Sequence, residues 1–163
     1  MNNNKNKWDD RFLGLALYYS TFSKDPSTKV GCVLVNDMNI PVGLGYNGFS
    51  RESDDLEEHL TNRDEKYPRT IHAEENAIYN STEDVRGSRA YLTHTPCVPC
   101  INRLSHNGIK HITFLVTMDS EFNKRWDLGR SIDEMTRLNM TYQVVSYSTN
   151  ERRDIFNDLY DIL

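Results

Sequence analysis

The sequence lacks a hydrophobic segment long enough to cross a membrane. Among its 163 residues the longest near-apolar run, Phe12 to Tyr19, ends after eight residues, whereas a spanning helix needs about 20. The first ten residues are rich in Asn, Lys and Asp and do not resemble a secretory signal. We therefore expect a cytoplasmic protein with no membrane partner.

Basic residues are scarce relative to acidic ones. Lys and Arg number 19 against 24 Asp and Glu, which gives a formal net charge of −5, and the basic residues are scattered along the chain. Nucleic-acid binding depends on clustered Lys and Arg that neutralise phosphates. The composition therefore predicts that nucleic acid is not a partner.

Cysteine is also rare, with three residues in the whole chain. In a sequence without a secretory signal, such cysteines are expected to be reduced, and a metal-binding or catalytic role is favoured over a disulfide. Cys97 and Cys100 form one Cys-x-x-Cys motif. Cys32 lies in a predicted strand and is interpreted as a small core residue.

Apolar residues are instead spread over most of the chain, whose length suits one domain that buries about 70% of the unfolded surface. Their spacing predicts alternating helices and strands with an opening hairpin, which indicates a three-layer α/β domain over residues 1–163. The charged segment 47–70 is predicted to be an exposed excursion. We expect helices over 8–19, 71–79, 98–107, 131–138 and 151–163, and strands over 30–35, 40–46, 89–93, 111–117 and 142–147.

Two short motifs predict a metal site: a His-Ala-Glu triplet that begins at His72, and a Pro-Cys-Val-Pro-Cys run that contains Cys97 and Cys100. The two cysteines lie on one face at the start of a predicted helix, where the helix dipole favours thiolates. With His72 they make a three-ligand set suited to tetrahedral zinc. Three protein ligands leave a position for water, which is typical of catalytic zinc sites.

Glu74, two residues after His72, is the candidate proton carrier. Zinc lowers the pKa of bound water from about 15.7 towards about 7, and a neighbouring carboxylate can accept the released proton. H-x-E followed by P-C-x-x-C is the signature of zinc nucleobase deaminases. The alternatives are a structural zinc or a buried thiol pair with an unrelated histidine. His94, just before the cysteines, is interpreted as a strand-end histidine with backbone partners, and pocket lining is the alternative.

Five stretches, which include some of the motif residues, carry a wider resemblance to a known family: residues 23–31, 45–48, 66–68, 72–78 and 91–93, the last leading into Pro96-Cys97. Over residues 8–115 the sequence resembles the deoxycytidylate (dCMP) deaminases of the zinc-dependent cytidine deaminase superfamily. The resemblance implies a cytidine-deaminase-like α/β/α fold with a mixed five-stranded sheet, bound Zn²⁺, and a homo-oligomer, with a hexamer favoured.

The resemblance also implies an activity, the hydrolysis of dCMP to dUMP and ammonia, which supplies thymidylate synthesis. Glu74 is then expected to move protons from the water to the cytosine N3 and to the departing amine. Asn47 matches the asparagine expected on the deoxyribose hydroxyl. Thr28, Lys24 and Lys29 are candidates for contact with the 5′-phosphate.

Many members of this family are activated by dCTP and inhibited by dTTP, each with Mg²⁺. The resemblance makes Tyr46, Gly48 and Arg51 candidates for effector contact. Ser50 and Glu52 stand where many relatives carry Pro and Gly, which leaves regulation open. The alternatives in function are deamination of dCTP, cytidine or a tRNA adenosine, and a catalytically silent nucleotide-sensing zinc scaffold. The acidic composition argues against the tRNA substrate, and Glu74 argues against the scaffold.

Overall fold

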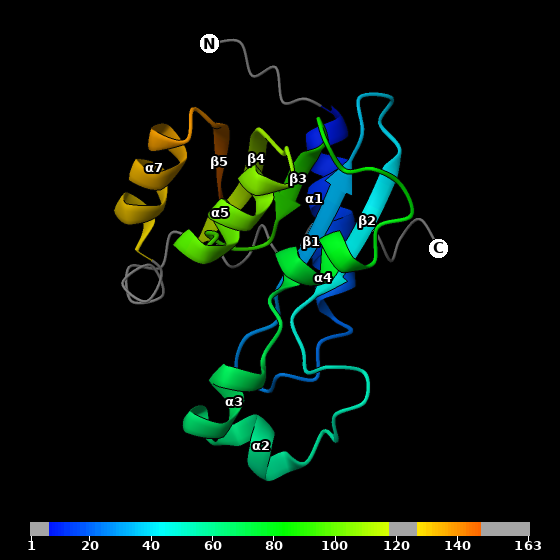
Figure 1. Ribbon diagram of the computed structural model, residues 1–163, viewed down its shortest axis with the longest axis vertical. Helices are drawn as coiled ribbons and strands as arrows, with labels where there is room; N and C mark the ends of the chain where they lie inside the picture. The colour runs from blue at the N-terminus through cyan, green and yellow to red at the C-terminus, as the bar shows by residue number, and fades with distance from the viewer. Residues whose placement is uncertain (1–6, 118–126, 148–163) are drawn as a thin grey trace.

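The computed structural model describes residues 7–117 and 127–147 (Figure 1). Within them the expected helices and strands are confirmed with small shifts at their ends, and the helix expected over 151–163 lies outside the described residues. No helix in the described part is long and apolar enough to cross a membrane. The elements are α1 (Lys7–Ser20), β1 (Gly31–Val35), β2 (Pro41–Tyr46), α2 (Glu57–Thr61), α3 (Arg63–Arg69), α4 (Ala73–Tyr79), β3 (Arg89–Leu92), α5 (Val98–His106), β4 (His111–Thr117), α7 (Leu128–Arg137) and β5 (Thr141–Tyr147).

The strands form one five-stranded sheet in the order β2-β1-β3-β4-β5. β1 pairs antiparallel with both β2 and β3, whereas β3, β4 and β5 run parallel. The β1–β2 hairpin turns at Asn39, which adopts φ 61°, and Asn36 Oδ1 accepts hydrogen bonds from two backbone N–H groups of the turn. Parallel neighbours need crossover connections, which α5 and α7 provide. The mixed five-stranded sheet is therefore confirmed.

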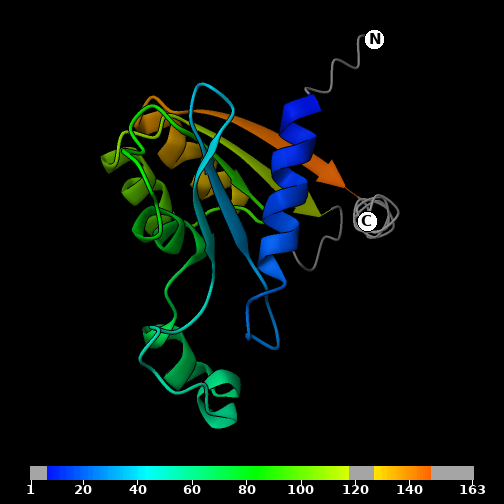
Figure 2. The same cartoon turned by 90° about the vertical axis from the view of Figure 1, so that its right-hand side faces the viewer.

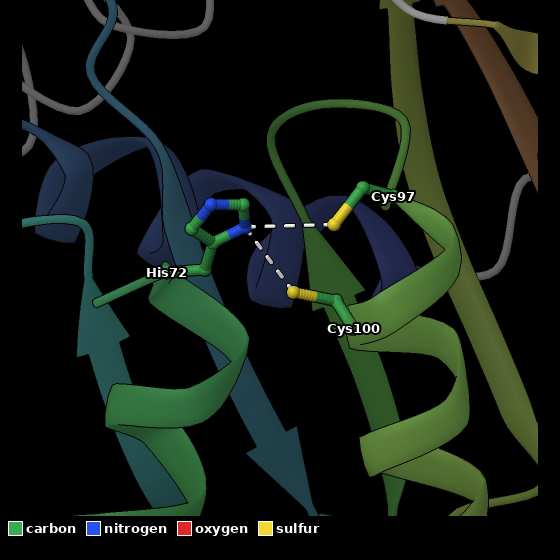
Figure 3. Close-up of side chains that lie close together, drawn as sticks. All are labelled: His72, Cys97 and Cys100. Atoms are coloured by element: carbon green, nitrogen blue, oxygen red, sulfur yellow. Dashed lines mark hydrogen bonds between the residues drawn. The ribbon is translucent and has the colours of Figure 1, made fainter. Parts of the chain in front are cut away.

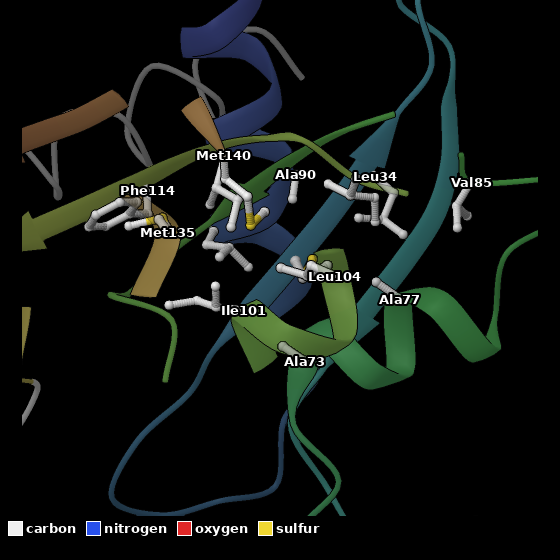
Figure 4. Close-up of a cluster of buried hydrophobic side chains, with 14 of the residues drawn as sticks. Leu34, Ala73, Ala77, Val85, Ala90, Ile101, Leu104, Phe114, Met135 and Met140 are labelled. Carbon is white, nitrogen blue, oxygen red and sulfur yellow. The ribbon is translucent and has the colours of Figure 1, made fainter. Parts of the chain in front are cut away.

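Helices cover both faces of this sheet, which confirms the three-layer arrangement (Figure 2). Because side chains alternate along a strand, β1, β3 and β4 each supply buried residues to both apolar layers. The α1 layer contains Phe12, Leu13, Ala16, Leu17, Val33, Val35, Tyr91, Leu115 and Tyr147. The opposite layer, under α4, α5 and α7, includes Leu34, Ala73, Ala77, Ala90, Ile101, Leu104, Phe114 and Met135 (Figure 4).

α4 packs unusually close to β2 because two glycines of the strand face two alanines of the helix. A Cβ built on Gly45 would lie 2.1 Å from the carbonyl oxygen of Ala73, and one on Gly43 would lie 2.4 Å from that of Ala77. No side chain larger than hydrogen fits at these positions. This contact fixes the start of α4, and with it His72, against the sheet.

The excursion over 47–70 is largely exposed, as predicted, and it is partly helical. It contains α2 and α3, which project from the body of the domain (Figure 1). The ammonium of Lys66, on α3, lies 3.1 Å from Asp25 Oδ1, and both side chains are buried. A second ion pair joins Lys24 to Asp55. These two pairs tie the projecting helices to the loop that precedes β1.

Candidate active site

The predicted metal ligands come from the starts of two neighbouring helices on the same side of the sheet (Figure 3). His72 is the residue that precedes α4, and Cys97 occupies the corresponding position before α5. Cys100 lies in the first turn of α5, where Pro99 costs little because that turn has unpaired N–H groups. The fold thus brings together the three residues that the motifs predicted.

The three side chains fit a tetrahedral zinc ion. His72 Nδ1 lies 3.5 Å from Cys97 Sγ and 3.3 Å from Cys100 Sγ, and all three atoms lie within 4.8 Å of one another. Bond lengths of about 2.3 Å for Zn–S and about 2.0 Å for Zn–N at the tetrahedral angle place N and S about 3.5 Å apart. Within the described residues, no other group of three His, Cys, Asp or Glu side chains has this proximity.

Hydrogen bonding within the cluster already favours a thiolate. The bond from Cys100 lowers the pKa of Cys97 to about 4, and the bond to Cys97 raises the pKa of His72 to about 9. The pKa of Cys100 is raised well above its usual value, chiefly by its bond to Cys97. Because zinc binds thiolates and neutral imidazole, binding must release protons from this cluster.

Glu74 lies in the first turn of α4 and is 5% exposed. Burial raises the pKa of its carboxyl group, and the neighbouring Cys97 acts in the same direction while His72 opposes it. A raised pKa makes a carboxyl group a better proton acceptor while it can still donate the proton again. The position and burial of Glu74 therefore suit acid–base chemistry.

Glu74 and Cys97 line a common cavity of about 150 Å³, a size that admits a benzene-like ring. His94 also lines it, so the favoured interpretation of His94 as a histidine outside the pocket was wrong. Its Nδ1 lies 2.9 Å from Thr93 Oγ1, which accepts a hydrogen bond from the Gly31 N–H. The lining residues are Asp25, Thr28, Val30, Asn47, Lys66, Tyr67, Thr70, His72, Ala73, Glu74, His94, Thr95 and Cys97.

Asn47 is buried in the wall of this cavity and holds the loop before β1. Its Oδ1 accepts a hydrogen bond from Val30 N at 2.8 Å, and its Nδ2 donates to Thr28 O at 2.9 Å. The next residue, Gly48, exchanges backbone hydrogen bonds of 3.1 and 2.8 Å with Ile71. Thr28 and Asn47 are thereby fixed beside His72, and the second N–H of the Asn47 amide is not used by these two bonds.

The lysines predicted for phosphate contact do not line the cavity that contains Glu74. Lys24 pairs with Asp55 and lines a neighbouring cavity, and the ammonium of Lys29 donates to Ser23 O. The lysine that lines the Glu74 cavity is Lys66. The sequence marked Lys66 only as a member of the 66–68 stretch that resembles the family. The fold shows that its ammonium is buried next to Asp25.

Tyr46, Gly48 and Arg51 line the neighbouring cavity together with Lys24. The two cavities share a wall made of Asp25, Asn47, Lys66 and Thr70. Arg51 Nη2 donates to Asn80 Oδ1 at 2.8 Å. The candidates for effector contact are therefore grouped together, next to the candidate active site.

Residues 6–116 match the family model described as the cytidine and deoxycytidylate deaminase zinc-binding region. This match covers more than half of the chain and contains the His-Cys-Cys cluster. The chain therefore belongs to the cytidine and deoxycytidylate deaminase family, whose zinc-binding region it carries.

Similar individual proteins include a deoxycytidylate deaminase and an uncharacterized deaminase. The chain is 40% identical to the deoxycytidylate deaminase of Mus musculus over 115 residues, 67% of this chain and 65% of the mouse enzyme. It is 37% identical over 123 residues to an uncharacterized deaminase in the luxG 3′ region of Aliivibrio fischeri, which covers 74% of this chain and 80% of that protein. The chain thus spans just under two thirds of the mouse enzyme.

Among solved structures, the dCMP deaminase of cyanophage S-TIM5, crystallised with dCMP and dUMP, superposes with a TM-score of 0.70. The alignment covers 86% of this chain and 98% of the phage chain at 24% identity. At this level of identity the likeness establishes the fold, a cytidine-deaminase-like α/β/α sandwich.

Proposed function

We propose that this protein catalyses the hydrolytic deamination of dCMP to dUMP and ammonia. The observation that carries the proposal is the His72, Cys97 and Cys100 cluster, of which His72 and Cys97 line one cavity of ring size together with the buried Glu74. Membership of the deaminase family and the 40% identity to a deoxycytidylate deaminase support the choice of substrate.

In this proposal His72, Cys97 and Cys100 hold zinc, and the charges of two thiolates and Zn²⁺ cancel. The ion, when bound, lowers the pKa of water towards about 7 and so supplies a nucleophile. Glu74 accepts the proton of the attacking water and delivers it to N3 of cytosine while a C–O bond forms at C4. Glu74 then takes the proton of the new hydroxyl at C4 and transfers it to the exocyclic nitrogen, so that the C4–N bond breaks, a C4 carbonyl forms and ammonia leaves.

The substrate contacts are part of the same proposal. Asn47 has an amide N–H left for a deoxyribose hydroxyl after its bonds to Thr28 and Val30. Thr28 stays a candidate for the 5′-phosphate. Lys66 joins Lys24 and Lys29 as a candidate cation, since it is the lysine that lines the cavity.

The phosphate assignment has a direct test. We expect Lys66→Met to raise KM for dCMP at least about tenfold while changing KM for deoxycytidine little, because an ion pair with the phosphate contributes binding that the nucleoside lacks. Lys24→Met and Lys29→Met are the matched controls. A rise in KM confined to one of these controls would assign the phosphate to that lysine instead.

Regulation and assembly belong to the proposal as well. We expect dCTP or dTTP with Mg²⁺ to bind near Tyr46, Gly48 and Arg51, in the cavity that shares a wall with the substrate site. A homo-oligomer, with a hexamer favoured, and a cytoplasmic location stay predictions. The negative charge of Glu52, next to Arg51, opposes the binding of a triphosphate in this loop.

The experiment that tests the function is absorbance-monitored deamination of dCMP, dCTP, CMP and deoxycytidine by the zinc-loaded protein. Each substrate is assayed with and without dCTP or dTTP and Mg²⁺. Activity on dCMP that rises with dCTP and falls with dTTP supports both the reaction and the regulation. Activity on dCMP that neither dCTP nor dTTP changes supports the reaction but not the regulation. No activity on any of the four substrates contradicts the proposal and favours a silent zinc scaffold or a nucleic-acid substrate.

A further inference from the structure

One ion pair joins the two helices that carry the candidate metal ligands. Arg103, on α5 one turn after Cys100, places its Nε 2.9 Å from Glu75 Oε1 on α4. The other oxygen of the same carboxylate, Oε2, accepts a hydrogen bond from the backbone N–H of His72 at 3.4 Å. A single carboxylate therefore contacts the segment that presents the histidine and the helix that presents both cysteines.

We propose that Glu75 and Arg103 are a positioning pair, which sets the distance between His72 and the two cysteines and thereby the affinity of the site for zinc. The inference rests on the proposed zinc site. The ligands come from two helices that are separate in sequence, so their spacing depends on whatever joins the helix starts. Groups that orient metal ligands without touching the metal commonly change affinity at least about tenfold when they are removed.

The exposure of the pair indicates that its effect is local. The Arg103 side chain is 47% exposed and that of Glu75 is 15% exposed, and ion pairs so open to solvent contribute little to global stability. The pair differs in placement from the Glu65–Arg69 pair, which joins residues within α3 alone. Glu65 and Arg69 are not among the residues that line the Glu74 cavity, so this pair serves as a matched control.

The test measures metal binding by the full-length chain, with deamination left aside. The variants are Glu75→Gln, Arg103→Met, their combination and Arg103→Lys, with Glu65→Gln as the control. Zinc affinity is measured by competition with a chromophoric chelator, and ligand geometry by the visible absorption of the Co²⁺-substituted protein. We expect about tenfold weaker zinc binding and an altered Co²⁺ spectrum in each single variant, no further loss in the combination, and partial recovery with Arg103→Lys.

Unchanged zinc affinity and Co²⁺ spectra in both single variants would overturn the proposed role of the pair. Losses that simply add in the combination would overturn it as well, since the residues would then act independently. A loss of thermal stability without any change in Co²⁺ spectrum would also overturn it, because a merely structural role has that signature. A wild-type chain that gives no tetrahedral Co²⁺ spectrum would instead overturn the zinc site on which the proposed function depends.

Discussion

At the scale of single residues, the chemistry depends on where one carboxyl group and two thiols are placed. Glu74 is buried beside the ligand cluster, while its neighbour Glu75 turns to Arg103. Two adjacent glutamates thus have different surroundings and, in our proposal, different roles. These roles can be distinguished by Glu→Gln variants at positions 74 and 75, which remove the charge and keep the size of the side chain.

Glu74→Gln is expected to keep zinc and to lower kcat at least about 100-fold, because an amide cannot accept and return a proton. Zinc content is measured by metal analysis and turnover by the dCMP assay. Glu65→Gln on the exposed face of α3 is the charge-matched control. Near-normal turnover in Glu74→Gln would show that another group carries the proton.

Cys97→Ser and Cys100→Ser are expected to lose most of the zinc and part of the stability, because metal binding and folding are coupled. Cys32→Ala is the matched control, since Cys32 is buried, as Cys100 is, but is not part of the cluster. Metal analysis and thermal unfolding, with and without added zinc, compare the three. Full zinc content in both serine variants would contradict the ligand assignment.

The sequence predicted the residues of the His-Cys-Cys cluster because their spacing and types carry the signal locally. Lys66 could not be found this way, because its ammonium is buried through a partner, Asp25, that is far away in the chain. His94 was misjudged for a similar reason. Its contact with the cavity depends on the loop before α5, whose path no local pattern describes.

At the scale of elements, the close contact between α4 and β2 determines where the site lies. Gly43 and Gly45 leave room for the backbone of α4, and the amides of Asn76 and Asn80 donate to Tyr46 O and Leu44 O at 2.8 and 3.2 Å. These bonds also cover carbonyl groups on the open edge of the sheet. The helix is thereby held along β2 from its first turn to its end.

Gly45→Ala is expected to destabilise the fold by about 1–3 kcal/mol or more, because the new methyl group would overlap the backbone of α4. The shift of α4 should also weaken zinc binding, since His72 precedes this helix. Gly129→Ala is the control, as the nearest atom to its added Cβ is a side-chain oxygen 3.6 Å away. Urea unfolding measures the free energy of unfolding of both variants. Equal losses in the two would show that the close approach of α4 to β2 is not the cause.

At the scale of the whole molecule, alternating helices and strands were enough to predict an α/β sandwich. The strand order was not predictable, because the pairing of β1 with β3 joins segments that are separated by the entire 47–70 excursion and α4. That excursion was predicted to be exposed, and its two helices were not foreseen. Its helices are held by the ion pair of Lys66 with Asp25, and such long-range pairs leave no periodic trace in a sequence.

The same pair links the stability of the molecule to pH. Burial alone would raise the pKa of Asp25, but hydrogen bonds from Ser27, Thr28 and Lys66 outweigh it, so the folded-state pKa lies below the usual 3.8. A group whose pKa is depressed by folding stabilises the protein above its unfolded pKa, and this contribution is lost as pH falls through the folded pKa. The contribution of Asp25 should therefore be complete above about pH 5 and decrease below about pH 4.

Asp25→Asn removes this contribution and is expected to cost roughly 3–5 kcal/mol near neutral pH, because it leaves the Lys66 ammonium buried without its carboxylate. The difference in unfolding free energy between wild type and variant should shrink as the pH falls from about 6 to about 3. Urea unfolding of both proteins at several pH values measures this difference. The double variant Asp25→Asn, Lys66→Met should cost less than Asp25→Asn alone, since no unpaired charge stays buried. A difference that does not change with pH would show that the carboxylate charge of Asp25 does not hold the projecting helices to the domain.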